Sequence, residues 1–247
     1  MSLFHRKTVL PSDFFQGVTD VHCHLLPGVD DGFPNEEASF KGLAYMESLG
    51  FRRIMLTPHV MLEYPDNTAS YLRQRFAIFK EKAAEHTSVE LRLAAEYMLD
   101  ERFISHKGEG WLYLSSATST LLVETSYLYK GHNMEQNLYD LMTEDQRVVI
   151  AHPERYAYAK RSDYVRWKDS SYLYQLNLMS LAGAYGGLAR ENALHLLESG
   201  MYDLVGSDLH KTETFRIFLP QMKLTPYQID LLRNLYENNA KLVDGLL

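Results

Sequence analysis

Histidine and carboxylate side chains recur in short motifs along this chain, and most of the motifs follow a run of apolar residues. They read DVHCH at 20–24, TPH at 57–59, AAE at 94–96, VE at 123–124, AHPER at 151–155 and SDLH at 207–210. A single histidine after a strand is more often a hydrogen-bonded loop residue than a ligand. A set that recurs along the whole chain is difficult to explain by chance. It predicts a centre that binds metal ions through imidazole and carboxylate groups.

The pair His22 and His24 is the most specific single signal. Side chains in a strand alternate between two faces, so His22 and His24 lie on one face and Cys23 lies on the other. Two imidazoles on one face can share a metal ion. Asp208 and His210 repeat the same spacing late in the chain, with a carboxylate as the harder ligand.

A loop with the sequence LLPGVDDG follows the first motif, over residues 25–32. Its Pro-Gly and Asp-Gly pairs predict a tight turn. Its two adjacent carboxylates also allow one side chain to fold back onto a metal ion. We expect Asp31 to be that ligand.

Alternating strands and helices must position these motifs. Strands are predicted over 17–22, 53–57, 90–95, 120–123, 147–151, 172–176 and 203–206. Amphipathic helices are predicted over 35–49, 68–86, 135–141, 188–197 and 226–243. This alternation is typical of a parallel sheet covered by helices. Seven β/α units favour a closed, TIM-like barrel, in which chemistry lies at the C-terminal ends of the strands. An open doubly wound sheet is the alternative.

The composition narrows the class of protein. The chain has 247 residues, of which 46% are hydrophobic, and no linker interrupts it, so one domain over 1–247 is expected. Its net charge of −7 argues against a nucleic-acid partner. It has no apolar run of membrane-spanning length, and residues 1–17 lack the apolar core of a secretion signal, so a cytoplasmic location is expected. The composition leaves the oligomeric state open.

The motifs together resemble those of a known family. DVHCHLLPGVDDG at 20–32 resembles the opening motif of the bacterial protein-tyrosine phosphatases of the polymerase and histidinol phosphatase (PHP) superfamily that are encoded with capsule and exopolysaccharide synthesis genes. AHPERY at 151–156 and SDLH at 207–210 resemble later motifs, and TPH, AAEY and VET match in order and spacing. The resemblance spans nearly the whole chain. It implies a distorted (β/α)7 barrel that holds three divalent metal ions, commonly manganese, although iron or zinc also suits these ligands.

The resemblance also implies which side chains bind each ion. The expected ligands are His22, His24, Glu96 and Asp208 for the first ion, Glu124 and His152 with a bridging Glu96 for the second, and Asp31, His59 and His210 for the third. Every expected ligand position is filled in this chain.

Two arginines match residues that bind phosphate in the family. Arg155 follows the AHPE motif directly, and a guanidinium can bind phosphate oxygens in a bidentate geometry that lysine cannot supply. The second family arginine follows the D-x-H motif. The nearest candidate here is Arg216, about one residue further from His210 than the family spacing.

The expected chemistry is hydrolysis of a phosphate monoester. Metal ions roughly 3.5–4 Å apart neutralise the dianion, and a hydroxide bridging them can attack phosphorus in line. Tyrosinate, with a pKa of about 10, leaves more easily than an alkoxide, which favours an aryl phosphate. The resemblance implies a protein-tyrosine phosphatase, and we expect its partner to be a capsule-associated bacterial tyrosine kinase.

A cysteine mechanism does not fit this chain. Cysteine-based phosphatases need an arginine six residues after the nucleophile, and that position holds Val29. Cys23, the single cysteine, also excludes an internal disulfide and a thiolate metal site. We expect Cys23 to pack on the outer face of the first strand.

Three alternative functions remain open from the residues alone. A phosphatase for a small metabolite such as histidinol phosphate would use the same centre and differ only at the rim of the pocket. An amidohydrolase that cleaves C–N bonds also begins with H-x-H, but it usually has a lysine on the fourth strand, where this chain has Glu124. A metal-bearing adaptor that docks on a kinase would lack turnover. His132, in the turn after the fourth strand, is interpreted as a residue that precedes a helix.

Overall fold

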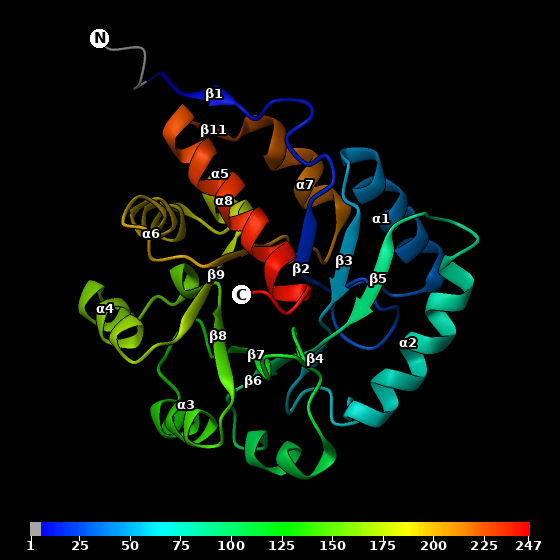
Figure 1. Ribbon diagram of the computed structural model, residues 1–247, viewed down its shortest axis with the longest axis vertical. Helices are drawn as coiled ribbons and strands as arrows, with labels where there is room; N and C mark the ends of the chain where they lie inside the picture. The colour runs from blue at the N-terminus through cyan, green and yellow to red at the C-terminus, as the bar shows by residue number, and fades with distance from the viewer. Residues whose placement is uncertain (1–5) are drawn as a thin grey trace.

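Parallel strands form the centre of the molecule, and helices lie around them (Figure 1). The structure is a computed structural model that describes residues 6–247. Residues 1–5 of the N-terminal segment, for which we predicted no secretion signal, lie outside the described residues. No helix within 6–247 is long and apolar enough to cross a membrane.

Two parallel sheets supply the strands of the centre. The smaller sheet has the order β2-β3-β5, with bounds Thr19–Cys23, Arg53–Leu56 and Glu90–Leu93. The larger sheet has the order β10-β9-β8-β7-β6-β4, with bounds Leu204–Gly206, Leu173–Asn177, Arg147–Ala151, Thr120–Glu124, Glu96–Met98 and His59–Val60. Each predicted strand is present within two residues of its expected bounds. The short strands β4 and β6 were not predicted.

The two sheets join because two strands bend and continue. The chain passes from β3 to β4 across Thr57 and Pro58, and from β5 to β6 across Ala94 and Ala95. At these bends the backbone N–H of Ala94 donates to the carbonyl of Leu56 at 2.9 Å. The N–H of Glu96 donates to the carbonyl of Pro58 at 3.1 Å. The bent strands β3/β4 and β5/β6 therefore run through both sheets, and each counts as one continuous strand of a single barrel.

The last strand closes the barrel against the first. The backbone N–H of Asp208 donates to the carbonyl of His22 at 2.8 Å, and that of His24 donates to the carbonyl of Leu209 at 3.0 Å. When β3/β4 and β5/β6 are each counted as one strand, seven strands surround the barrel axis. The fold is a distorted, TIM-like (β/α)7 barrel of the PHP type, so the alternative of an open sheet is wrong.

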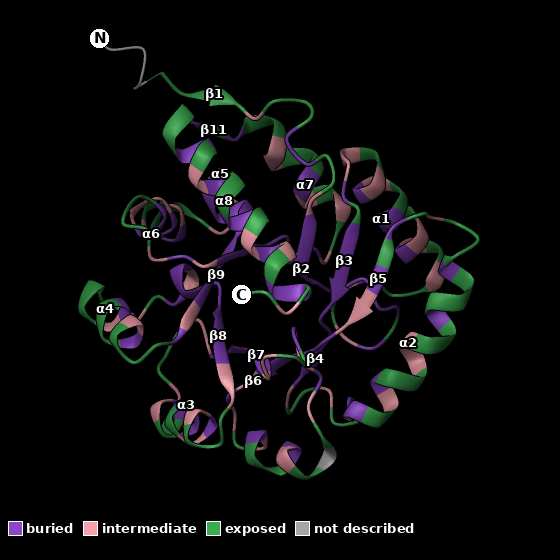
Figure 2. Cartoon of the chain, in the orientation of Figure 1, coloured by how far each residue is buried: buried purple, intermediate pink, exposed green. Residues whose placement is uncertain are grey.

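Helices cover the barrel on its outer side. Their bounds are α1 Glu36–Leu49, α2 Ala69–Ala83, α3 Met134–Thr143, α4 Arg161–Asp169, α5 Leu178–Ala182, α6 Gly187–Glu198, α7 Thr212–Phe218 and α8 Pro226–Val243. The buried faces of these helices turn toward strands that are buried almost throughout (Figure 2). Short 3-10 helices lie at Phe103–Glu109, Pro153–Arg155 and Leu219–Gln221.

The last turn of α8 and the residues after it close the end of the barrel opposite the metal-ligand motifs. Leu242 and Val243 of α8 join an apolar cluster with inward residues of the strands, among them Val21, Met55 and Leu122. Polar contacts fix the same end: Arg53 binds Asp244 at 3.0 Å and Arg147 binds the carbonyl of Leu247 at 2.5 Å. β11 (Lys223–Leu224), which directly precedes α8 in the sequence, forms an antiparallel pair with β1 (Thr8–Val9).

Candidate metal centre

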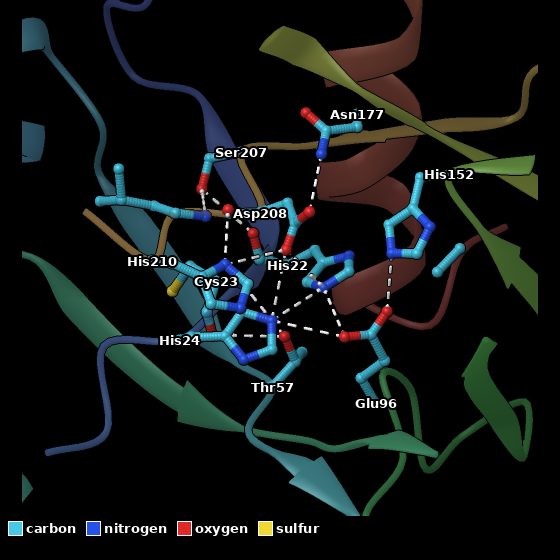
Figure 3. A network of polar contacts seen from close by, with 12 residues as sticks. His22, Cys23, His24, Thr57, Glu96, His152, Asn177, Ser207, Asp208 and His210 are labelled. Carbon is cyan, nitrogen blue, oxygen red and sulfur yellow. Dashed lines mark hydrogen bonds and ion pairs between the residues drawn. The ribbon is translucent and has the colours of Figure 1, made fainter. Parts of the chain in front are cut away.

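Histidine and carboxylate side chains converge at the C-terminal ends of the strands, at the open end of the barrel (Figure 3). A cavity of about 410 Å³ leads to them. Two of these residues have left-handed backbone conformations, with φ of +33° at His152 and +50° at Asp208. Such strained conformations in non-glycine residues gather at functional sites, because the surrounding fold must hold them in place.

The four residues expected around the first ion lie together. Nε2 of His22 is 3.2 Å from Nε2 of His24, 3.1 Å from Oε2 of Glu96 and 3.4 Å from Oδ1 of Asp208. Nε2 of His24 is 3.4 Å from the same Glu96 oxygen and 3.3 Å from the same Asp208 oxygen. All four side chains are buried. Their ligand atoms thus surround one point.

Glu96 also contacts one residue expected around each of the other two ions. Its Oε1 lies 2.9 Å from Nε2 of His152, expected at the second ion, and its Oε2 lies 3.2 Å from Nδ1 of His59, expected at the third. Glu124 completes this group, with Oε1 at 3.0 Å from His59 Nδ1 and Oε2 at 3.9 Å from His152 Nε2. The two oxygens of Glu96 therefore face different neighbours, as a bridging carboxylate requires.

The third expected group is more open to solvent. Oδ1 of Asp31 lies 3.5 Å from Nε2 of His59 and 3.4 Å from Nε2 of His210. The ring of His24 stacks on that of His210, with centroids 3.8 Å apart. Asp31 is 62% exposed, so this group forms the solvent side of the cluster.

Two residues outside the expected ligand set orient the first two histidines. Nδ1–H of His22 donates to Oε1 of Gln175 at 2.8 Å, and Nδ1–H of His24 donates to Oδ2 of Asp30 at 2.9 Å. Each bond fixes the proton on Nδ1 and leaves Nε2 free to bind a cation. The adjacent carboxylates of the loop thus differ in position: Asp30 supports His24, and Asp31 faces His59.

The electrostatics of the cluster require positive charge at its centre. Burial raises the pKa of Glu96, but the charges of and hydrogen bonds from His22 and His152 outweigh it, so that its pKa lies well below the ordinary value. The pKa of Asp208 also lies well below its ordinary value, because the charges of His22 and His210 outweigh the effect of burial. Burial lowers the pKa of His24, yet Asp30 and the other carboxylates raise it well above the ordinary value. The carboxylates stay ionised, and the guanidinium of Arg155, protons on the imidazoles or bound metal ions balance their charge.

Two buried atoms of the cluster are also placed to bind a metal ion. Nδ1 of His59 and Oε1 of Glu124 lie 3.0 Å apart as an ion pair, yet neither atom makes a hydrogen bond of good geometry. Buried polar atoms are almost always satisfied in folded proteins. A donor set of imidazoles and carboxylates without thiolate suits manganese, iron or zinc. The residues present therefore fit divalent cations.

Arg155 lies in the wall of the same cavity. Its NH1 donates to Oδ2 of Asp208 at 2.7 Å. Its guanidinium carbon lies 4.2 Å from the ring centroid of Tyr127 and 4.1 Å from that of Tyr185. Two aromatic faces and one carboxylate thus hold the guanidinium at the edge of the cluster. Sequence reasoning did not identify the role of Tyr185.

Arg216 is not brought to this cavity. It is exposed on α7, and its guanidinium lies over the ring of Tyr45 on α1, 4.4 Å from the centroid. Phe215 takes the inward position on this helix, and the next residue is turned about 100° away. The cationic side chain that does line the cavity beyond His210 is Lys211.

Cys23 points away from the cluster, as the strand alternation predicted. Its buried thiol contacts the carbonyl of Met55 at 3.4 Å and packs with the outer apolar core. Burial raises the pKa of this thiol well above its ordinary value. The thiolate that a cysteine mechanism needs is therefore disfavoured.

A closed parallel barrel with such a cluster at the C-terminal ends of its strands defines a metal-dependent hydrolase of the barrel type. The model of the capsular polysaccharide synthesis family, CpsB/CapC, matches residues 18–230, and the chain belongs to this family. The resemblance indicated by the sequence motifs is confirmed.

Known relatives agree with this assignment. The tyrosine-protein phosphatase YwqE of Bacillus subtilis (strain 168) is 27% identical over 204 residues, which cover 79% of this chain and 78% of YwqE. CapC of Staphylococcus aureus is 24% identical over 233 residues, covering 92% of this chain and 91% of CapC. A crystal structure from work on YwqE and on CpsB of Streptococcus pneumoniae, two metal-dependent tyrosine phosphatases, matches with a TM-score of 0.81. That match has 25% identity and covers 93% of this chain and 95% of the other.

Proposed function

We propose that this chain, acting as one domain, is a metal-dependent protein-tyrosine phosphatase. The observation that carries the proposal is the position of Glu96, whose two oxygens contact different histidines beside a cavity that also contains Arg155. The names of YwqE and CpsB, both tyrosine phosphatases, support the same activity.

We further propose three divalent ions, with manganese as the natural metal. The proposed ligands are His22, His24, Glu96 and Asp208 for the first, Glu96, Glu124 and His152 for the second, and Asp31, His59 and His210 for the third. Ligand atoms that lie within 4.8 Å of one another fall into three groups, which supports three ions: His22, Glu96, His152 and Asp208; His59, Glu96 and Glu124; and His24, Asp31, His59 and His210. The groups differ from the proposed division in placing His152 with His22, His24 with His210, and His59 also with Glu124. Bound divalent ions supply charge neutralisation and Lewis acidity toward a phosphate monoester.

Arg155 is proposed to bind the phosphate. A guanidinium has five N–H donors, and Asp208 accepts from NH1 of this one. The remaining donors are available for phosphate oxygens, and the rings of Tyr127 and Tyr185 limit how far the group can turn. Because it is held before substrate arrives, Arg155 can stabilise developing charge with little reorganisation.

The cavity walls suit an aromatic leaving group. Tyr64 and Tyr127 line the cavity together with Met61 and Met98. Aromatic rings and thioethers both pack favourably against a phenol ring. A phosphorylated tyrosine could therefore place its phosphate at the cluster and its ring against these side chains.

The proposed partner is a bacterial tyrosine kinase of capsule synthesis, dephosphorylated on a tyrosine-rich tail. The family description, capsular polysaccharide synthesis, supports that setting. An extended tail can present its phosphate at an open barrel mouth without refolding either protein.

The experiment is a substrate panel with metal-stripped protein and individual metals added back. The panel contains p-nitrophenyl phosphate, phosphotyrosine and phosphoserine peptides, histidinol phosphate and nucleotide monophosphates. We expect metal-dependent turnover, with the highest kcat/KM for phosphotyrosine. A metabolite that wins by about a hundredfold, or about 2.7 kcal/mol, would refute the tyrosine-phosphatase assignment and leave the metal chemistry intact.

A further inference from the structure

A second cavity opens beside the first. It has a volume of about 610 Å³, and four residues line both cavities: Met61, Glu63, Met98 and Tyr127. Its other walls are Leu62 and residues 99–101, 125–126, 128–129 and 131–133, in the loops that follow β4, β6 and β7. We call this hollow, lined by 61–63, 98–101, 125–129 and 131–133, the flanking groove.

Hydrogen bonds hold the walls of the flanking groove together. The backbone N–H of Leu62 donates to Oδ2 of Asp100 at 2.7 Å, which joins the loop after β4 to the loop after β6. The N–H of Leu99 donates to the carbonyl of Glu124 at 2.9 Å, which joins the second wall to β7. The groove is therefore preformed, and a ligand need not order it.

The groove exposes large apolar side chains. Leu62 is 49% exposed, Leu128 is 79% exposed and Tyr129 is 67% exposed. Adjacent exposed apolar side chains beside a polar site are typical of a surface that binds another molecule. They would gain free energy by packing against apolar side chains of a ligand.

The charge of the groove is acidic. Glu63 and Glu101 are exposed in its walls. Asp100 is already engaged, because its two oxygens accept hydrogen bonds from the N–H groups of Leu62 and Arg102. His132 lies in the same wall, so it both precedes α3 and lines a groove. Free carboxylates here repel acidic ligands and attract basic ones.

We infer that the flanking groove binds the residues next to the phosphotyrosine of a polypeptide substrate. The inference rests on the proposed function, because a phosphotyrosine seated in the first cavity must lead its chain out of it. The shared lining makes the groove a continuous exit for an extended segment. Its chemistry selects an apolar side chain beside the phosphotyrosine and a basic residue beyond it, and it rejects acidic neighbours.

The test compares peptides with p-nitrophenyl phosphate, which has no neighbouring residues to place in the flanking groove. The manganese-loaded protein is assayed with equal-length phosphotyrosine peptides that carry Leu then Lys, Gly then Gly, or Leu then Glu beside the phosphotyrosine. We expect kcat/KM to fall in that order. Leu128→Ser and Tyr129→Ser should each raise KM for the Leu-Lys peptide by about fivefold, while p-nitrophenyl phosphate turnover stays unchanged.

Charge reversal gives an independent arm. Glu101→Lys should invert the preference, so that the Leu-Glu peptide becomes a better substrate than the Leu-Lys peptide. Matched controls are Tyr227→Ser and Glu237→Lys on α8, a helix that lines neither cavity. Both controls should behave like the wild-type protein with every substrate.

The outcomes separate the inference from the proposed function. Groove variants that leave the peptide KM unchanged, or that alter p-nitrophenyl phosphate to the same extent, would overturn the inference while the phosphatase assignment stands. A wild-type protein that hydrolyses neither p-nitrophenyl phosphate nor any phosphotyrosine peptide would overturn the proposed function, and the inference with it.

Discussion

At the scale of single residues, Glu96 is the carboxylate that contacts the most imidazoles among the described residues of the cluster. Its carboxylate lies within 3.4 Å of four imidazoles, those of His22, His24, His59 and His152. Removing it would leave these rings without the anion that two proposed ions share. The consequences for metal content and for turnover should therefore be coupled.

We predict that Glu96→Ala abolishes turnover and lowers the metal content of the purified protein. Elemental analysis and the p-nitrophenyl phosphate assay measure the two effects. Glu85→Ala, at an exposed position after α2, is the matched control and should change neither. Full activity in the Glu96 variant would show that the cluster is assigned wrongly.

Arg155 and Arg216 should differ sharply when replaced. Arg155→Ala should weaken transition-state stabilisation by about 2–4 kcal/mol, seen as a loss of kcat/KM, because one preorganised donor group is lost. Arg155→Lys should restore only part of it, since an ammonium cannot bind two oxygens as a fork. Arg216→Ala, which removes a contact with Tyr45, should leave kcat/KM unchanged. An equal loss of kcat/KM in both alanine variants would indicate that Arg216 also binds the phosphate.

The sequence predicted which side chains gather in the cluster but not the residues that orient them. The convergence of His22, His24 and Asp208 was predictable because strand periodicity and strand ends are local properties. Gln175 was not, since a glutamine inside a strand gives no signal until the fold brings it to His22. The side of α7 on which Arg216 lies depends on where the helix begins. A shift of one residue along the helix decides whether this side chain faces the cavity.

At the scale of elements, clear boundary signals made some helices predictable. The helix predicted over 226–243 matches α8 at both ends. Its start is fixed by a capping box, in which the side chain of Thr225 accepts from the N–H of Gln228 and the side chain of Gln228 accepts from the N–H of Thr225. The strands β4 and β6 were missed because they are two and three residues long and follow bends in longer strands.

The helices α4, α5 and α7 were also missed, for a related reason. They have nine, five and seven residues, too few to establish a helical period in the sequence. In α4 only Tyr164 and Trp167 are buried, and the other positions are polar or partly exposed. Tertiary packing, which the sequence does not reveal, decides such short elements.

We predict that Thr225→Ala lowers the free energy of unfolding by about 1 kcal/mol, the usual cost of losing a helix N-cap. Urea denaturation measures the change. Turnover should be unaffected, because no residue of α8 lines the catalytic cavity or the flanking groove. A change in kcat with no change in stability would contradict this separation of α8 from the proposed site.

At the scale of the whole molecule, the barrel concentrates ionised carboxylates and imidazoles at one end. We predict that chelation abolishes turnover and lowers Tm, and that added manganese restores both. Ions that bind only the folded state stabilise it by mass action, so Tm should rise with metal concentration. Differential scanning fluorimetry over a manganese titration measures this. Active protein that contains no metal on elemental analysis would refute the whole proposal.

The seam between β2 and β10 sets the order in which a newly made chain can reach this state. His22 and Ser207, which meet at the seam, are 185 residues apart in sequence. While the ribosome is still making the middle of the chain, β2 has no closing neighbour, and its free edge is open to wrong pairing. The proposed site of the first ion, which needs His22 and Asp208 together, cannot form until the SDLH segment has left the exit tunnel. Barrel closure and binding of the proposed first ion therefore belong to the same late event in biosynthesis.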